Sequence, residues 1–239
     1  MDGGNGRLQA LTTAGEPLGN SPLPPRAAFY ISRFATGGRI LASTLGQDSC
    51  LAVLYGPDGR ELNRFGTPPV EPPSLVDMGA LREQINAGGV PELFRNTVIP
   101  LEAPDGQFWL AMLANGEIWR FDAGGSPLGR TVLEEPEMEK ILADFFEKNK
   151  EDAPRPSLYP LAYIADIQVA GPEVWVLLNR ADEDSVVLLA FSSEGEKLRR
   201  ILLPAVHGVK QFAADPLHER LYLAVPSEAQ VLGVDLRLE

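Results

Sequence analysis

Short apolar runs alternate with glycine-containing turns along most of the chain. Residues 51–55 are one such run, and the turn Asp58-Gly59 separates them from a second, more polar segment that begins at Arg60. The dipeptides Gly124-Gly125 and Glu194-Gly195 occupy the same place in later segments. Glycine adopts the positive φ that tight hairpin turns require, so each segment is predicted to be a strand, a turn and an antiparallel strand.

This strand–turn–strand template recurs, and a second apolar hairpin precedes most of its copies. The copies cover residues 6–23, 51–62, 116–133, 188–204 and, cut short, 231–235. The second strands of the preceding hairpins include residues 40–42, 108–111, 174–177 and 221–224. The repeating unit is therefore four short antiparallel strands, and Gly15 and Gly59 mark a period of 44 residues.

Four strands in roughly 40–45 residues is the spacing of a β-propeller blade. Lone blades leave both sheet faces uncovered, so they stack radially and bury one another. The pattern predicts an all-β propeller in a single domain over residues 1–239, with a β-sandwich as the alternative fold. About five blades are visible. The first is partial and has only its third and fourth strands, the next three are complete, and the last lacks a fourth strand. Because both ends contain a third strand, two interpretations are open: the chain is part of a larger, six-bladed ring, or it is a ring whose closing blade is misassigned.

Two insertions, about 67–95 and 134–160, interrupt the repeat between a fourth strand and the next first strand. Up-and-down connectivity places such connections on one face of a propeller, so we expect the insertions to lie side by side. In the first insertion, Ser74 and Asp77 resemble a capping box, and apolar residues at helical spacing end at the pair Gly88-Gly89. These apolar residues are Leu75, Met78, Leu81 and Ile85.

The second insertion predicts a more regular helix. Pro136 suits a first helical turn, and the neighbouring Glu134, Glu135 and Glu137 favour the positive end of the helix dipole. Met138, Ile141, Leu142, Phe145 and Phe146 form one continuous apolar stripe. Two interpretations remain open: the helices cap the blade edges, or they wall a groove over the channel in which Phe145 contacts a ligand or partner.

The composition narrows the range of partners. The chain carries 33 acidic and 21 basic residues and a net charge of −12, which disfavours nucleic acid and membrane surfaces as partners. No stretch approaches the roughly 20 apolar residues needed to span a bilayer. Cys50 is the single cysteine, and its apolar neighbours predict a core residue rather than a reactive thiol.

Catalytic signatures are sparse. The chain has two histidines, His207 and His218, which fall at opposite ends of one predicted hairpin, so a histidine-based triad or zinc site is disfavoured. The sequence contains no nucleophile elbow, P-loop or dinucleotide fingerprint. The acidic run Asp182-Glu183-Asp184 is predicted to lie on the same face as the insertions. It is interpreted as a solvated loop, with calcium as the metal it would otherwise hold.

Polar residues on the predicted innermost strands line the channel and are the candidates for ligand contact. Alignment on Phe34, Ile167 and Phe212 puts Arg33, Asp166 and Gln211 in register, and Arg33 and Asp166 are expected either to bind ligand or to pair with each other. The full set of candidates on the ligand face is Arg33, Arg95, Asn96, Phe145, Tyr163, Asp166, His207 and Lys210.

The phrase from Val53 to Gly66 resembles the blade signature of NHL-type and related six-bladed, TolB-like propellers. The resemblance implies a fold, and by analogy a periplasmic or secreted protein. Such families include scaffolds, sensors and binding proteins, and also lactonases and a lyase that use metal ligands at the channel. We therefore expect a non-enzymatic domain that binds a protein or small ligand on the insertion-bearing face, without a cofactor. The alternative is a metal-dependent, lactonase-like hydrolase or lyase that uses Asp166.

Overall fold

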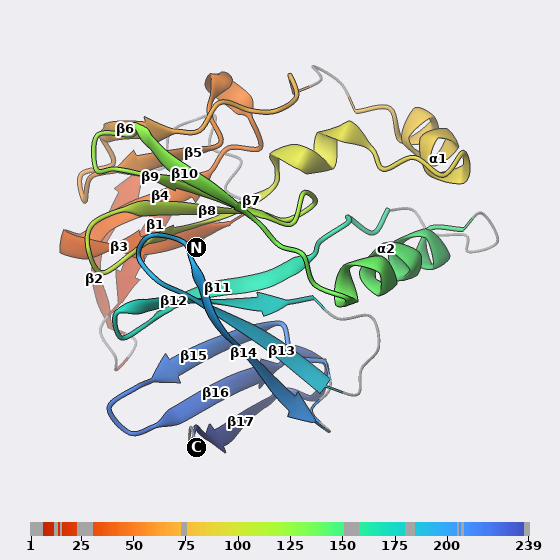
Figure 1. Cartoon of the computed structure of the whole chain (residues 1–239). Helices are drawn as coiled ribbons and strands as arrows, with labels where there is room; N and C mark the ends of the chain where they lie inside the picture. The colour runs from red at the N-terminus through yellow and green to blue at the C-terminus, as the bar shows by residue number, and fades with distance from the viewer. Residues whose placement is uncertain are drawn as a thin grey trace.

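The computed structural model describes residues 7–11, 14, 16–22, 31–72, 76–150, 158–179, 185–204, 206 and 208–236. Within these residues, three four-stranded sheets, one three-stranded sheet and one two-stranded hairpin are formed. Neighbouring strands in every sheet are antiparallel and follow one another in chain order. Figure 1 shows the larger sheets arranged one after another, like the blades of a fan.

We number the four larger sheets as blades. Blade 1 contains β3 (Ser32–Ala35), β4 (Arg39–Ser43), β5 (Ala52–Tyr55) and β6 (Glu61–Phe65). Blade 2 contains β7 (Val98–Glu102), β8 (Phe108–Met112), β9 (Glu117–Phe121) and β10 (Pro127–Val132). Blade 3 contains β11 (Ile164–Ala170), β12 (Glu173–Leu178), β13 (Ser185–Phe191) and β14 (Lys197–Pro204).

The chain ends complete the set of strands. Blade 4 contains β15 (Gln211–Asp215), β16 (Arg220–Val225) and β17 (Gln230–Asp235). The N-terminal hairpin contains β1 (Arg7–Leu11) and β2 (Pro17–Pro22). Single-turn 3-10 helices are η2 (Thr36–Gly38), η3 (Gln47–Ser49) and η5 (Pro226–Glu228). The predicted order is confirmed: an initial hairpin, three complete blades and a blade of three strands.

The first strand of each blade lies next to the first strand of the following blade. β3 contacts β7, β7 contacts β11, and β11 contacts β15. First strands that neighbour one another while the later strands splay outward define the radial arrangement of a propeller. The predicted all-β propeller is confirmed in its architecture.

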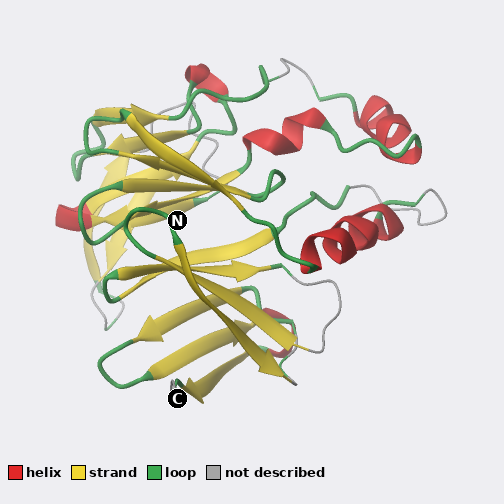
Figure 2. Cartoon of the chain, viewed as in Figure 1, coloured by secondary structure: helices red, strands yellow, loops and turns green. Residues whose placement is uncertain are grey.

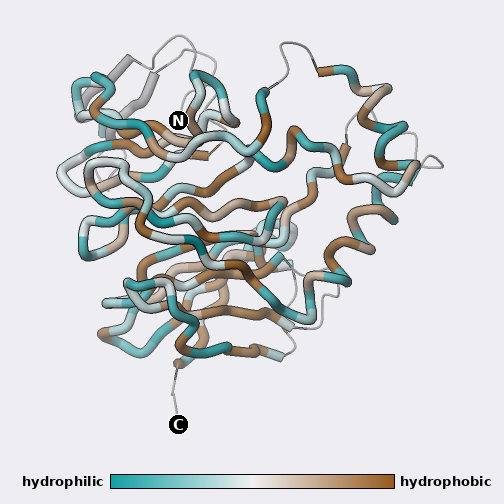
Figure 3. Tube along the Cα trace, turned by 45° about the horizontal axis from the view of Figure 1, so that its top comes forward, coloured by the Kyte–Doolittle hydropathy of each residue, from teal (hydrophilic) through white to brown (hydrophobic). Residues whose placement is uncertain are grey.

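Three hydrophobic cores fill the spaces between consecutive blades. Phe65 and Phe108 stack with ring centroids 4.5 Å apart between blades 1 and 2. Trp109 and Ile167 belong to the core between blades 2 and 3, and Phe212 belongs to the core between blades 3 and 4. Figure 3 shows the hydrophobic residues concentrated on the strands, with hydrophilic residues at several of the turns. Burial of these side chains between blades therefore holds neighbouring blades against one another.

The turn between β9 and β10 packs tightly against blade 1. Gly125 has a φ of 85°, and a Cβ built on it would lie 2.8 Å from the backbone oxygen of Arg64. Asn63 completes this contact, because its Nδ2 donates to the carbonyl oxygen of Ala123 at 3.1 Å. Glycine is thus required here by both backbone conformation and packing.

Gly125→Ala is expected to lower the free energy of unfolding by about 2 kcal/mol, since a left-handed alanine costs about 1 kcal/mol and the clash adds a similar amount. Gly106 is the matched control: its φ is 82°, and a Cβ there would meet nothing within 4 Å. Gly106→Ala should therefore cost only the conformational part. Urea unfolding of both variants measures the difference, and equal losses would contradict the packing role of Gly125.

The insertions form helices on one side of the propeller, as predicted (Figures 1 and 2). They are α1 (Met78–Asn86), the 3-10 helix η4 (Glu92–Asn96) and α2 (Glu137–Lys148). α1 and α2 share a separate hydrophobic cluster that contains Ile85, Phe94, Ile141 and Phe145. Among the described residues, no helix is both long enough and apolar enough to cross a membrane.

The start of α1 differs from the predicted capping box. Asp77 caps α1, because its side chain accepts hydrogen bonds from the backbone nitrogens of Gly79 and Ala80 at 2.9 and 3.2 Å. The helix therefore begins at Met78, and Ser74 and Leu75 lie outside the described residues. The short aspartate reaches the first free N–H groups by itself, as N-cap residues do.

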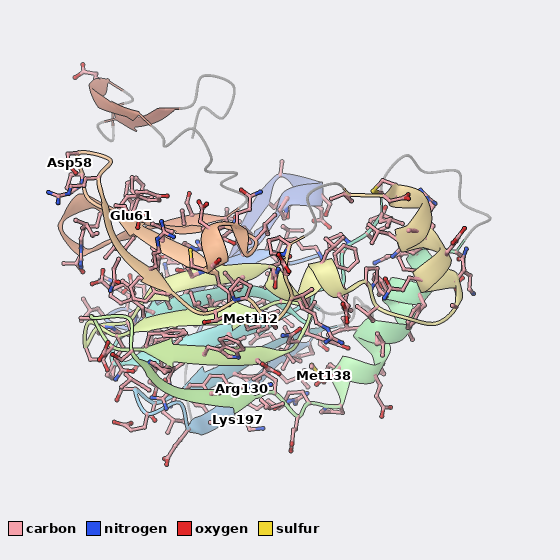
Figure 4. The ribbon with its side chains drawn as sticks, turned by 90° about the horizontal axis from the view of Figure 1, so that it is seen from above. Asp58, Glu61, Met112, Arg130, Met138 and Lys197 are labelled. Atoms are coloured by element: carbon pink, nitrogen blue, oxygen red, sulfur yellow. The ribbon has the colours of Figure 1, made fainter. Side chains whose placement is uncertain are left out.

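Ion pairs attach the start of α2 to blade 3. Glu135 accepts from Lys197 Nζ at 2.6 Å, and Glu137 accepts from Arg200 Nη2 at 2.6 Å. Met138 points toward the blades at the start of this helix (Figure 4). These glutamates were predicted to interact with the helix dipole. They also pair directly with β14, and this pairing fixes the helix relative to the blade.

Candidate binding site on the helix-bearing face

Asp166 lies at the centre of the channel-lining strands. It sits on β11, beside an irregularity in the pairing with β12, and its side chain is 1% exposed. Arg33 on β3 donates to Asp166 Oδ1, and the backbone nitrogen of Ile167 donates to the same oxygen at 2.9 Å. Gln168 Nε2 and the backbone nitrogen of Phe212 donate to Oδ2 at 3.2 and 3.1 Å.

Asp166 therefore joins three blades through one carboxylate. Arg33 belongs to blade 1, Asp166 to blade 3 and Phe212 to blade 4. The expectation that Arg33 and Asp166 pair with each other is confirmed. Gln211, aligned with them in the sequence, has an exposed side chain and begins β15. Each oxygen of Asp166 already accepts two hydrogen bonds, so this carboxylate acts as a bridge between blades.

Arg95 and Asn96 lie at the end of η4. Arg95 is exposed on the helix-bearing face. Asn96 is buried: its Nδ2 donates to the carbonyl oxygen of Val70 at 2.8 Å, and its Oδ1 accepts from the backbone nitrogen of Val70 at 3.4 Å. The paired contacts hold the connection that follows blade 1, and contact of Asn96 with a ligand stays a prediction.

Phe145 and Tyr163 belong to the cluster beneath the helices. Phe145 is 3% exposed, and its ring packs edge-on against Phe94 with centroids 6.1 Å apart. The apolar stripe of α2 is covered by the molecule itself, which favours the interpretation in which the helices act as caps, and contact of Phe145 with a ligand or partner stays a prediction. Tyr163 is half-buried, and burial raises the pKa of its phenol, so it stays neutral at physiological pH.

Of the remaining residues with possible chemical roles, the structure describes only some. His207 and the acidic run 182–184 lie outside the described residues. Cys50 is buried as predicted, and burial raises the pKa of its thiol, which keeps it protonated. Among the residues that the structure describes, no group of three or more His, Cys, Asp or Glu side chains is placed to hold a metal ion.

A pocket of about 310 Å³ lies between blades 3 and 4, where β12 ends and β13 begins. Lys210, one of the predicted candidates, lies at this pocket, and its Nζ donates to Asn179 Oδ1 at 2.9 Å. Asn179 is itself held by its Nδ2, which donates to the carbonyl oxygen of Ala162 at 2.9 Å. The pocket is lined by Leu177, Leu178, Ser185, Val186, Val206, Gly208, Val209, Lys210, Pro226 and Ser227.

This lining combines apolar walls with a few polar groups. The walls come from leucine, valine and proline, whereas two hydroxyl groups and one ammonium group supply the polarity. Such a combination is typical of small-molecule sites, in which few polar groups set the orientation of a mostly apolar ligand. Sequence reasoning identified Lys210 but missed Asn179, Ser185 and Ser227. Only their position in the repeat could have pointed to them, since all three lie in or beside connections between second and third strands, on the predicted ligand face.

No family model and no curated protein matches the chain. Solved structures do. A Bacteroides caccae protein of unknown function is 13% identical with a TM-score of 0.53, and the match covers 97% of this chain and 72% of that one. A streptogramin B lyase is 13% identical with a TM-score of 0.55, covering 99% and 64%. A catalytically inactive virginiamycin B lyase from Staphylococcus aureus with quinupristin is 12% identical with a TM-score of 0.52, covering 99% and 65%.

The chain is a β-propeller. At these identities the likeness shows the fold and no activity. The chain also spans less than two thirds of the length of either lyase structure.

Proposed function

We propose that this propeller is a non-enzymatic binding domain that takes a small ligand in the pocket between blades 3 and 4. The observation that carries the proposal is the pocket itself, which opens beside Lys210 on the predicted face. Its volume of about 310 Å³ is at the lower end of the range of ligand sites. Apolar walls and one cation favour a compact ligand with an apolar body and an anionic end.

The contacts of Asp166 favour binding over catalysis. A general base or metal ligand needs lone pairs that can accept a proton or an ion. Both oxygens of Asp166 already accept hydrogen bonds, and those bonds join blades 1, 3 and 4. Chemistry at this carboxylate would have to break contacts that hold the propeller together.

The alternative function is a metal-dependent, lactonase-like hydrolase or lyase with its site at the channel. Two of the similar structures are lyases, but their identity of 12–13% supports only the fold. Calcium is the ion that this alternative would favour, and Asp166 would be its carboxylate ligand.

Other features of the proposal rest on the sequence. The phrase that resembles NHL-type and TolB-like blades forms β5, its turn and β6, which supports a blade of that type. A six-bladed ring, a periplasmic or secreted location and the absence of nucleic-acid and membrane partners remain predictions. So does the assignment of residues 1–239 to one domain.

The pocket is tested with hexanoate and hexylammonium, which share an apolar chain and differ in the sign of their charge. Hexanoate should bind more tightly, because its carboxylate can reach the ammonium group of Lys210. Lys210→Met should weaken hexanoate binding about tenfold, equivalent to 1.4 kcal/mol, within the range for a hydrogen bond to a charged group. Saturation-transfer NMR and calorimetric titration measure both affinities.

Lys140→Met is the matched control, since Lys140 is exposed on α2 and does not line the pocket. It should leave the hexanoate affinity unchanged. Equal binding of hexylammonium, or an unaffected Lys210→Met variant, would refute the proposed anionic ligand.

A further inference from the structure

A second and larger groove lies between the outer strands of blades 1 and 2, away from the Lys210 pocket. Its volume is about 770 Å³, which exceeds the size of the pocket between blades 3 and 4. It runs from the start of β5 past the end of β6 to the hairpin of β9 and β10. The lining residues are Ser49, Cys50, Arg64, Phe65, Gly66, Thr67, Trp119, Arg120, Phe121, Gly125, Pro127, Leu128, Gly129 and Arg130.

One wall of the groove is an assembled tryptophan–arginine surface. Trp119 donates from its indole nitrogen to Glu117 Oε2 at 2.9 Å. Arg130, opposite Trp119 on β10, lies over the indole ring at 5.7 Å from its centroid and donates to Glu117 Oε1. Glu117 therefore orients both side chains. The floor beside them is formed by the buried rings of Phe65 and Phe121.

The charged side chains that line this groove are all basic, and two of them, Arg64 and Arg130, pair with Glu61 and Glu117. Three arginines and no carboxylate line it, although the protein carries a net charge of −12. Arg64 already has partners at all three of its guanidinium nitrogens, because Nε and Nη2 donate to Glu61 and Nη1 donates to the carbonyl oxygen of Asp48. This contact lowers the pKa of Glu61, which keeps the pair ionised at neutral pH.

Arg130 is the arginine best placed to bind a further anion. Its side chain is 55% exposed, and one guanidinium nitrogen holds Glu117. A guanidinium group carries five donors, so Arg130 can keep Glu117 and also bind a second carboxylate. Exposed Leu128, on the same strand, extends the apolar surface beside it.

The outer edge of β6 does not favour a ligand bound by strand addition. Asn63 Oδ1 accepts from the backbone nitrogen of Arg64 at 2.8 Å, which occupies a donor on that edge. The neighbouring hairpin covers the same region, since Asn63 also binds the carbonyl oxygen of Ala123. An occupant must therefore be recognised by its side chains, through apolar anchors and carboxylates.

We propose that this groove docks an extended acidic peptide segment of a partner protein. Leucine-like anchors would pack on Trp119 and Leu128, and a carboxylate would pair with Arg130. A volume of about 770 Å³ holds several peptide residues, whereas a single small anion would fill little of it. This site is independent of the pocket at Lys210, so either proposal can fail while the other stands.

Tryptophan fluorescence gives a selective test. The chain has three tryptophans; Trp109 and Trp175 are buried at 0% and 3% exposure, and Trp119 is half-buried. The probe is an acetylated, amidated octapeptide of alternating glutamate and leucine. It should shift the tryptophan emission and protect it from acrylamide quenching, and Trp119→Phe should abolish this response. The same peptide with lysine in place of glutamate should bind at least tenfold more weakly.

Arg130→Gln should reduce the affinity for the glutamate–leucine peptide about tenfold or more. Arg60→Gln is the matched control, because Arg60 is an exposed arginine in the turn of blade 1 outside the groove, and it should leave the affinity unchanged. The absence of any response to the peptide would overturn the proposal. So would equal binding of the lysine peptide, or equal binding of glutarate, which would indicate a site for small anions only.

Discussion

Replacing Asp166 with alanine is expected to lower the free energy of unfolding by about 3 kcal/mol. Removal of one partner of a buried ion pair leaves an uncompensated charge, which costs about 3–5 kcal/mol. The lower value applies because the Arg33 side chain remains 24% exposed and can be partly solvated. The variant also leaves the buried backbone nitrogen of Phe212 without its acceptor. Urea unfolding followed by circular dichroism measures the loss.

Glu228→Ala is a suitable control for this variant. Glu228 is an exposed acidic residue in η5, and its removal should change the free energy of unfolding by no more than about 0.5 kcal/mol. A loss for Asp166→Ala as small as that of the control would show that the carboxylate does not join the blades.

The same carboxylate distinguishes the binding domain from the metal-dependent enzyme. Melting temperatures are compared with calcium, zinc or magnesium and after treatment with a chelator. A metal at one hundred times its dissociation constant would add about 2.7 kcal/mol, which corresponds to roughly 5–10 °C for a domain of this size. We expect no such shift. A shift that disappears in Asp166→Asn would favour the hydrolase or lyase.

Replacing Phe145 with aspartate is expected to destabilise the helical layer by at least about 4 kcal/mol. Loss of a buried aromatic ring alone costs about 3–5 kcal/mol, and an unpaired carboxylate in its place adds a desolvation penalty. The affected residues form their own cluster, separate from the cores between the blades. The helical signal should therefore be lost at a lower temperature than the blades unfold, as followed by circular dichroism at two wavelengths.

Leu217→Asp is the matched control, since this leucine is 92% exposed at a turn of blade 4. The same chemical change at that position should leave both transitions in place. A Phe145→Asp variant with an unaltered helical signal would show that the ring does not lie in the cluster. The test also bears on partner capture, because any binding lost in this variant would follow from unfolding of the helices.

The sequence was sufficient to predict the blades because their signals are local. Gly59, Gly125 and Gly195 all adopt positive φ, and each lies at the turn where the hairpin pattern required it. The order of the sheets followed from counting strands between those turns. The helical stripe of α2 was likewise a local pattern, and its residues do form a helix.

The sequence was insufficient where the answer depended on packing between distant segments. An apolar stripe shows that one face of α2 is covered but does not show what covers it, so the sequence left open whether Phe145 packs inside the molecule or contacts a partner. The surface of Trp119 and Arg130 depends on the register of β9 against β10, and a shift of one residue would separate the two side chains. Arg33 and Asp166 were correctly aligned because equivalent strands of a repeat share a register.

The bridge at Asp166 also has a kinetic consequence. Most contacts within a blade join residues close in sequence, whereas Arg33 and Asp166 are 133 residues apart. Contacts across such a separation need the intervening loops to be closed first, so this pair forms after the individual blades. An interaction absent from the transition state slows unfolding and leaves the folding rate nearly unchanged. The ion pair is therefore expected to lower the unfolding rate and so to prolong the lifetime of the assembled blades.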